Sequence, residues 1–250
     1  MTPIALEVPD ITYPSIQVLN KSAIYSDFRD ELQQNGYAVL KNVIPQDRAL
    51  HYRQKAFDWL NSFETKFDLD KPETWIAKNL PAMNKVRMFH LWGTDELLVS
   101  FNCLNINLPN RPDLSARNPW PHVDQSPNKR GLHCVQGIIN LSVSGPDDGG
   151  LVVYPGSHML HDAFFDAHPN RAERQFQNDI YFFPREELEW FENRGLKPHK
   201  VCAEPGDLLI WGSRTIHYGA DSNEAGKNIR TANYATYMPA SLASADQLAK

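Results

Sequence analysis

The residues that could bind a metal ion begin with the segment Pro121-His122-Val123-Asp124-Gln125. His122 and Asp124 are two positions apart, so both side chains leave the same face of an extended strand. An imidazole and a carboxylate make half of a metal site, and His217 is the candidate that completes it. Two histidines and one carboxylate on one face of an ion are the ligand set of non-haem Fe(II) oxygenases.

The histidine–aspartate spacing has a simpler interpretation, because such a triplet arises often by chance. A surface histidine beside a turn aspartate would look the same, and the chain contains nine histidines in all. The setting of His217 favours the metal site. It follows the turn Pro205-Gly206-Asp207, an apolar strand and a short loop.

Arg230 lies thirteen residues beyond His217, on the last predicted strand. An arginine that points into a barrel is costly to bury without a partner. A dicarboxylate would supply that partner, because the planar guanidinium binds a carboxylate through two parallel hydrogen bonds. A surface arginine is the alternative, and Arg214, in the loop before His217, is the second candidate for the same role.

The elements that must position these residues are mostly strands. We expect helices over 27–35, with Ser26 as N-cap, and over 46–63, and a strand over 37–40. Period-two patterns and Gly/Pro turns predict strands near 98–108, 132–143, 151–154, 207–211 and 228–238. Pro155-Gly156-Ser157-His158 indicates a turn, and 159–200 an aromatic and charged insertion with one helix near 185–194.

This order of elements predicts a mainly β fold with flanking helices, a jelly roll of the double-stranded β-helix type. The helices come early in the chain and are expected to cover one outer face. We expect one domain over 1–250, with an N-terminal arm and helical flank over 1–97 and the jelly-roll core over 98–240. The insertion 159–200 is either a lid over the mouth or a satellite core under a long loop.

Composition limits the partners of the chain. Its 250 residues carry a formal net charge of -5, which gives no hint of nucleic acid or acidic lipid. The three cysteines, Cys103, Cys134 and Cys202, are odd in number and favour buried thiols over a disulfide or a thiolate ligand. With neither a signal peptide nor an apolar run long enough for a membrane span, we expect a cytoplasmic protein that binds a small molecule.

The motifs together resemble the phytanoyl-CoA dioxygenase family. The resemblance covers roughly 98–240 and rests on Pro121 to Gln125, Gly149-Gly150-Leu151, Pro155 to His158, Pro205 to Leu208, and His217 with Arg230. It implies a double-stranded β-helix that uses Fe(II), with 2-oxoglutarate and O2 as co-substrates. It also implies that His122, Asp124 and His217 ligate iron, that Arg230 holds the distal carboxylate of 2-oxoglutarate, and that Gln136 faces the co-substrate.

The expected reaction is oxidation of a small polar metabolite by hydrogen abstraction. Such a substrate would be an amino acid or an intermediate of specialised metabolism, and hydroxylation, desaturation or cyclisation would be the outcome. Candidate substrate residues are Asn102, Trp120, Gln125 and Arg87. Two other functions fit the pattern less well. One is a cupin-like metal-dependent isomerase or hydrolase without 2-oxoglutarate, and the other is a non-catalytic β-sandwich.

Overall fold

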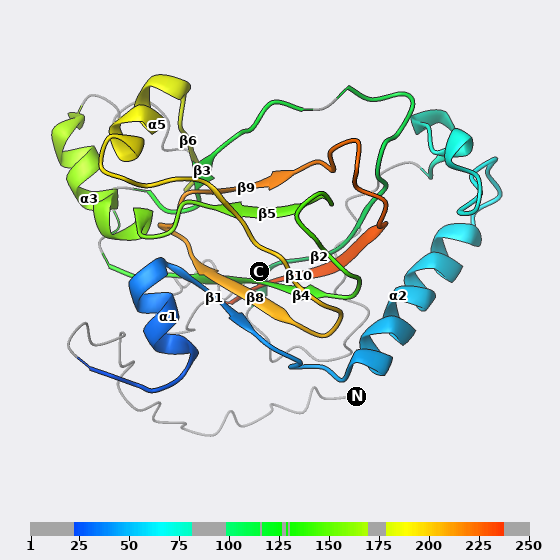
Figure 1. Ribbon diagram of the computed structural model, residues 1–250, viewed down its shortest axis with the longest axis horizontal. Coiled ribbons are helices and arrows are strands. Elements are labelled where there is room, and N and C mark those ends of the chain that lie inside the picture. Colours follow the sequence, from blue (N-terminus) through cyan, green and yellow to red (C-terminus); the bar gives the residue numbers. More distant parts are fainter. Residues whose placement is uncertain are drawn as a thin grey trace, which may run out of the picture.

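Two five-stranded antiparallel sheets lie against each other and form the body of the molecule (Figure 1). The computed structural model describes residues 23–81, 99–115, 117–126, 129, 131–169 and 179–237. In strand order, the first sheet contains β1 (Tyr37–Leu40), β8 (Leu208–Gly212), β4 (Val135–Asn140), β10 (Arg230–Tyr237) and β2 (Val99–Asn107). The second contains β6 (Tyr181–Phe182), β3 (His122–Val123), β9 (His217–Ala220), β5 (Gly150–Val153) and β7 (His199–Lys200). This arrangement is the predicted jelly roll.

The alternation of side chains along β8 shows how the first sheet divides its two faces. Leu209 and Trp211 point between the sheets, where they pack with Ile138 of β4 and Val153 of β5. Ile210 points outward and packs under the first helix. Because successive strand residues leave opposite faces, an apolar strand such as β8 serves both layers at once.

The first helix, α1 (Phe28–Asn35), covers the outer face of the first sheet, where Leu32 packs on Ala38 and Ile210. Its N-cap is Asp27, one residue after the predicted N-cap Ser26, because the Asp27 carboxylate accepts a hydrogen bond from the Arg29 backbone N–H. It ends at Gly36, whose φ of 80° lies in the left-handed region that favours glycine.

The second helix, α2 (Gln46–Asn61), packs at one end of the first sheet and starts after Pro45, as predicted. Two 3₁₀ turns, η1 (Pro72–Thr74) and η2 (Ala77–Asn79), follow it. Leu60 joins Phe67 and Trp75 in a small cluster against Ile106 of β2. The early helices therefore cover the first sheet, as expected.

At one end of the second sheet, beside β6 and β3, lie α3 (Ser157–Ala167) and α5 (Arg185–Glu192) (Figure 1). The prediction of a turn over Pro155–His158 was therefore wrong at its end, since α3 begins at Ser157. Residues 161, 164 and 165 have helical spacing and are all buried, which explains this helix. Helices also occur late in the chain, so they flank both sheets.

The described part of the insertion 159–200 forms a satellite core rather than a lid. Its members are aromatic or aliphatic side chains of α3, β6 and α5 that pack at this end of the second sheet: Phe164, Phe165, Tyr181, Phe183, Leu188 and Phe191. The predicted arm over 1–22 and a helical turn considered at 95–98 lie outside the described residues.

Two further predictions concern the length of one strand and the state of the cysteines. β4 is shorter than the predicted strand over 132–143. All three cysteines are free, as expected, but the prediction that they are buried was wrong, because Cys103 and Cys134 are half-buried and Cys202 is exposed. Among the helices that the structure describes, none has the length and apolar character needed to cross a bilayer.

Candidate metal centre

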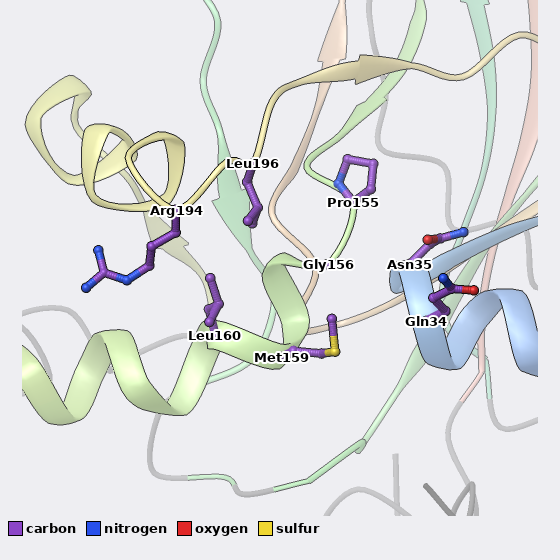
Figure 2. A pocket seen from close by; sticks show the side chains of 8 residues that line it. All are labelled: Gln34, Asn35, Pro155, Gly156, Met159, Leu160, Arg194 and Leu196. Carbon is purple, nitrogen blue, oxygen red and sulfur yellow. The ribbon is translucent and has the colours of Figure 1, made fainter. Parts of the chain in front are cut away.

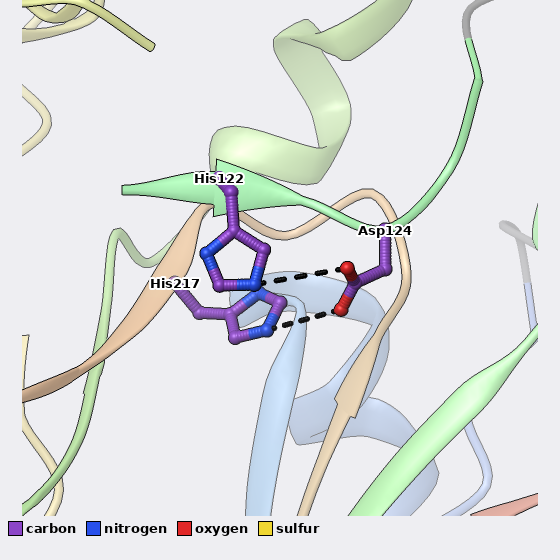
Figure 3. A group of neighbouring side chains, drawn as sticks. All are labelled: His122, Asp124 and His217. Carbon is purple, nitrogen blue, oxygen red and sulfur yellow. Dashed lines mark ion pairs between the residues drawn. The ribbon is translucent and has the colours of Figure 1, made fainter. Parts of the chain in front are cut away.

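The metal-binding candidates meet at the middle of the second sheet. β3 and β9 are antiparallel neighbours, and His122 lies directly opposite His217 in their register. Asp124 follows the end of β3, where its backbone N–H donates to the Ser213 carbonyl at 2.9 Å. The two strands and this one hydrogen bond therefore bring together three side chains that are widely separated in the sequence (Figure 3).

The distances within this group fit a mononuclear site. One potential ligand atom from each residue lies within 4.8 Å of the other two. Nε2 of His122 is 3.7 Å from Oδ1 of Asp124, and Nε2 of His217 is 3.3 Å from Oδ2 of the same carboxylate (Figure 3). All three donors thus face one point, and the chemistry of the set, two imidazoles and a carboxylate, suits Fe(II).

Backbone carbonyls fix the orientation of both imidazoles. Nδ1 of His122 lies 3.2 Å from the Trp120 carbonyl oxygen, and Nδ1 of His217 lies 2.9 Å from that of Thr215. A carbonyl accepts only from a protonated ring nitrogen, so each Nδ1 donates, and in the neutral ring Nε2 keeps its lone pair. Metal-ligating histidines commonly have this second hydrogen bond, which sets the tautomer and the ring direction.

Electrostatics leave His122 and Asp124 in the protonation states that a metal needs. Burial lowers the pKa of His122 to about 4, and the neighbouring His217 lowers it further than Asp124 raises it. Burial would raise the pKa of Asp124, but hydrogen bonds and charges from His217, His122 and Gln136 hold it below its usual value. Near neutral pH the site therefore presents a neutral His122 and an ionised Asp124.

Gln136 of β4 contacts the carboxylate ligand. Its Nε2 donates to Oδ2 of Asp124 at 2.6 Å, while its buried Oε1 has no hydrogen-bond partner. The sequence predicted that this residue faces the co-substrate. The structure places its amide nitrogen against Asp124, where it restrains the carboxylate, and its free oxygen is the part that remains available to another group.

Two aromatic side chains frame His122 at the open side of the sheet. The Trp120 ring stacks on the His122 ring with centroids 4.6 Å apart, and its Nε1 donates to the Gly219 carbonyl at 3.1 Å. The Phe182 ring lies 5.6 Å from the same imidazole. Both remain partly exposed, at 39% and 50%. A molecule that approaches the centre would therefore meet aromatic surface.

Arg230, at the start of β10, is 4% exposed. Nη1 donates to Oδ1 of Asn105 on β2 at 3.1 Å, which is the one hydrogen bond the structure records for this guanidinium. No described acidic side chain forms an ion pair with it. A buried guanidinium with free donors suits an anionic ligand. Asn105 was not predicted, although its place on the same face as Arg230 follows once β2 and β10 are paired.

The structure places the candidate substrate residues in different surroundings. Trp120 lies beside the metal centre, as described above. Gln125 is 1% exposed, and its amide donates to the Lys129 and Gly131 carbonyls and accepts from Ser213 Oγ. Both ends of that amide are therefore engaged by the protein. Arg87 and the side chain of Asn102 lie outside the described residues. Phe182 was not assigned to the site, because its β6 register with His122 cannot be seen in the sequence.

A separate hollow of about 480 Å³ lies on the outside of the molecule, between α1, the start of α3 and the turn after α5 (Figure 2). It is lined by Gln34, Asn35, Pro155, Gly156, Met159, Leu160, Arg194 and Leu196. Its one charged side chain, Arg194, stacks over the Trp190 ring at 3.5 Å. The hollow contains none of the metal-binding candidates, so it is distinct from the centre.

Comparisons with known proteins agree with this geometry. The family model of phytanoyl-CoA dioxygenase (PhyH) matches residues 115–232, which include all three metal-binding candidates and Arg230. A relative from Aspergillus versicolor, "Ava biosynthesis cluster protein O", is 35% identical over 243 residues. The match covers 86% of this chain and 78% of the relative.

Solved structures share the fold at low sequence identity. EvdMO1 superposes with a TM-score of 0.54 at 18% identity, over 84% of this chain and 49% of its own, so the chain spans about half the length of EvdMO1. EctD from S. alaskensis, solved with 2-oxoglutarate and 5-hydroxyectoine, gives a TM-score of 0.51 at 17% identity over 85% and 75% of the two chains. At such identities these likenesses concern the fold alone.

Proposed function

Because the chain belongs to the phytanoyl-CoA dioxygenase family of Fe(II)- and 2-oxoglutarate-dependent oxygenases, we propose that it oxidises a small metabolite of a biosynthetic pathway. The observation that carries the proposal is the convergence of His122, Asp124 and His217, with both Nε2 atoms directed at the same carboxylate. In this proposal these three residues hold the iron, which supplies the site where 2-oxoglutarate and dioxygen react.

The protein's own groups prepare that site. The Trp120 and Thr215 carbonyls keep each imidazole in the tautomer that offers Nε2. Gln136 holds the Asp124 carboxylate in place. Three ligands on one face leave the opposite face for exogenous ligands, as in other sites of this ligand set. Arg230, buried and without an acidic partner among the described residues, would hold the distal carboxylate of 2-oxoglutarate.

The substrate class follows from the relative and from the surroundings of His122. The name of the Aspergillus versicolor relative places that protein in a biosynthesis cluster, which favours an intermediate of specialised metabolism over a free amino acid. The partly exposed rings of Trp120 and Phe182 favour a substrate with a planar or apolar part close to the reacting carbon. Hydroxylation, desaturation and cyclisation are all compatible with this arrangement.

The test measures succinate formed from 2-oxoglutarate by the Fe(II)-loaded protein in air, with and without candidate intermediates. A true substrate should increase succinate release and be consumed in a one-to-one ratio with it. Dioxygen labelled with the heavy oxygen isotope then separates the outcomes. Hydroxylation carries one labelled atom into the product, whereas desaturation or ring closure yields a product lighter by two hydrogens and without label. A protein that binds neither Fe(II) nor 2-oxoglutarate would refute the proposal.

A further inference from the structure

A second cation lies beside Arg230, and the sequence did not draw attention to it. Lys200 ends β7, and its Nζ is 3.5 Å from the Ser144 hydroxyl. A β-carbon placed on Gly150 would lie 2.5 Å from Lys200 Nζ and 3.5 Å from Arg230 Nε. The two positively charged nitrogens are therefore both within 3.5 Å of one point in the structure.

No described carboxylate neutralises this pair. The charge of Asp148 acts on Lys200, but Asp148 forms no ion pair with the lysine. Its two oxygens instead accept hydrogen bonds from the Gly145 N–H and from the backbone and side chain of Asn228. Two like charges brought this close in a partly buried place repel each other unless an anion lies between or beside them.

The position of Lys200 depends on the absence of a side chain at Gly150. Any β-carbon there would occupy the space of the ammonium group. The Ser144 hydroxyl, which donates to the Gly149 carbonyl at 3.2 Å, lies next to the same position and offers its oxygen to the ammonium. The chain thus keeps a long cationic side chain in a confined place, although the fold would be served as well by an apolar one.

We propose that Lys200 is a second cationic contact for the distal carboxylate of 2-oxoglutarate, and acts together with Arg230. This inference rests on the proposed function, because it takes 2-oxoglutarate as the ligand. A carboxylate has two oxygens with about four lone-pair positions, so it can accept from a guanidinium and an ammonium at once. Ser144 and Gly150 are then positioning residues, since they act through Lys200.

The pair gives co-substrate binding a characteristic pH dependence. Burial, followed by the charge of Arg230, lowers the pKa of Lys200 to about 8, while Cys202 and Asp148 act weakly in the opposite direction. The ammonium is charged below this pH and neutral above it. Affinity for 2-oxoglutarate should therefore be highest below pH 8 and fall as the pH rises past it, by up to about tenfold per pH unit.

The experiment measures anaerobic binding of 2-oxoglutarate to the Fe(II)-loaded protein, through the visible charge-transfer band or by calorimetry. Pyruvate, which shares the keto acid but lacks the distal carboxylate, is the second ligand. Lys200→Met should weaken 2-oxoglutarate binding by about tenfold to a hundredfold, leave pyruvate binding unchanged and remove the fall above pH 8. Lys71→Met, at an exposed lysine paired with Asp68, is the matched control and should change neither ligand.

The outcomes separate this inference from the function on which it rests. If the wild-type protein binds neither ligand, the proposed function fails. If it binds both, and Lys200→Met weakens neither or weakens both equally, the function stands and the role of Lys200 is refuted. The wild-type pH profile is a test that needs no variant, because a 2-oxoglutarate affinity that stays flat from below pH 8 to well above it would also overturn the proposal.

Discussion

Replacement of Gln136 by leucine should weaken metal binding without lowering the stability of the fold. Gln136 donates to Oδ2 of Asp124 at 2.6 Å, and a hydrogen bond to a charged group contributes about 1.5–3 kcal/mol. The loss of that bond should raise the dissociation constant of the metal by roughly tenfold to a hundredfold. The same change removes the buried Oε1, which has no partner and costs about 1–3 kcal/mol of folding free energy. The variant should therefore bind metal more weakly and yet be at least as stable as the wild-type protein.

Calorimetric titration of the metal-free protein with Co(II) measures the affinity, and chemical denaturation in the presence of a chelator measures the stability. The sequence predicted that Gln136 faces the co-substrate, and this experiment distinguishes the two roles. If Gln136→Leu binds metal as the wild-type protein does and loses affinity only for 2-oxoglutarate, then its contact with Asp124 does not hold the carboxylate and our reasoning is refuted.

Other substitutions test the remaining parts of the site. His122→Ala should abolish measurable metal binding in the same titration while the metal-free protein stays folded, because it removes one of three proposed ligands; retained stoichiometric binding would remove His122 from the ligand set. Arg230→Met should raise the dissociation constant of 2-oxoglutarate roughly a hundredfold without affecting pyruvate; an equal loss for both ligands would show that Arg230 supports the site only indirectly. Gln125→Ala should lower the free energy of unfolding by about 3 kcal/mol, since it leaves the buried Ser213 hydroxyl and the half-buried Lys129 and Gly131 carbonyls without this partner; unchanged stability with a raised KM for the substrate would restore the prediction that Gln125 lines the substrate site.

The sequence predicted those parts of the candidate site whose residues lie close together along the chain. His122 and Asp124 are two positions apart on the chain, so their common face could be predicted before the fold was known. The Asp124 side chain reaches the site from just beyond the end of β3, which contains only His122 and Val123. The direct pairing of His122 with His217 could not be predicted, because it depends on the register of two strands that are distant in the chain.

Residues that act through tertiary contacts were the ones missed. Lys200 has no motif around it, and its relation to Arg230 arises only because β7 pairs with β5 next to Gly150. The helix α3 was missed because Pro-Gly-Ser-His is typical of a turn. Ser157 nonetheless begins a helix there, and its hydroxyl accepts a hydrogen bond from the Ile216 N–H, which leads directly into β9. Such a contact, 59 positions apart, leaves no trace in local sequence patterns.

The carbonyl of Gly36, at the end of α1, accepts hydrogen bonds from the Gly212 N–H and from the Thr215 hydroxyl. Thr215 in turn orients the imidazole of His217. Gly36 lies far outside the stretch 115–232 that the family model matches. A protein trimmed to that stretch would therefore retain every proposed iron ligand and still lose the support behind one of them, so the extent of the recognisable motif is smaller than the unit that must be expressed.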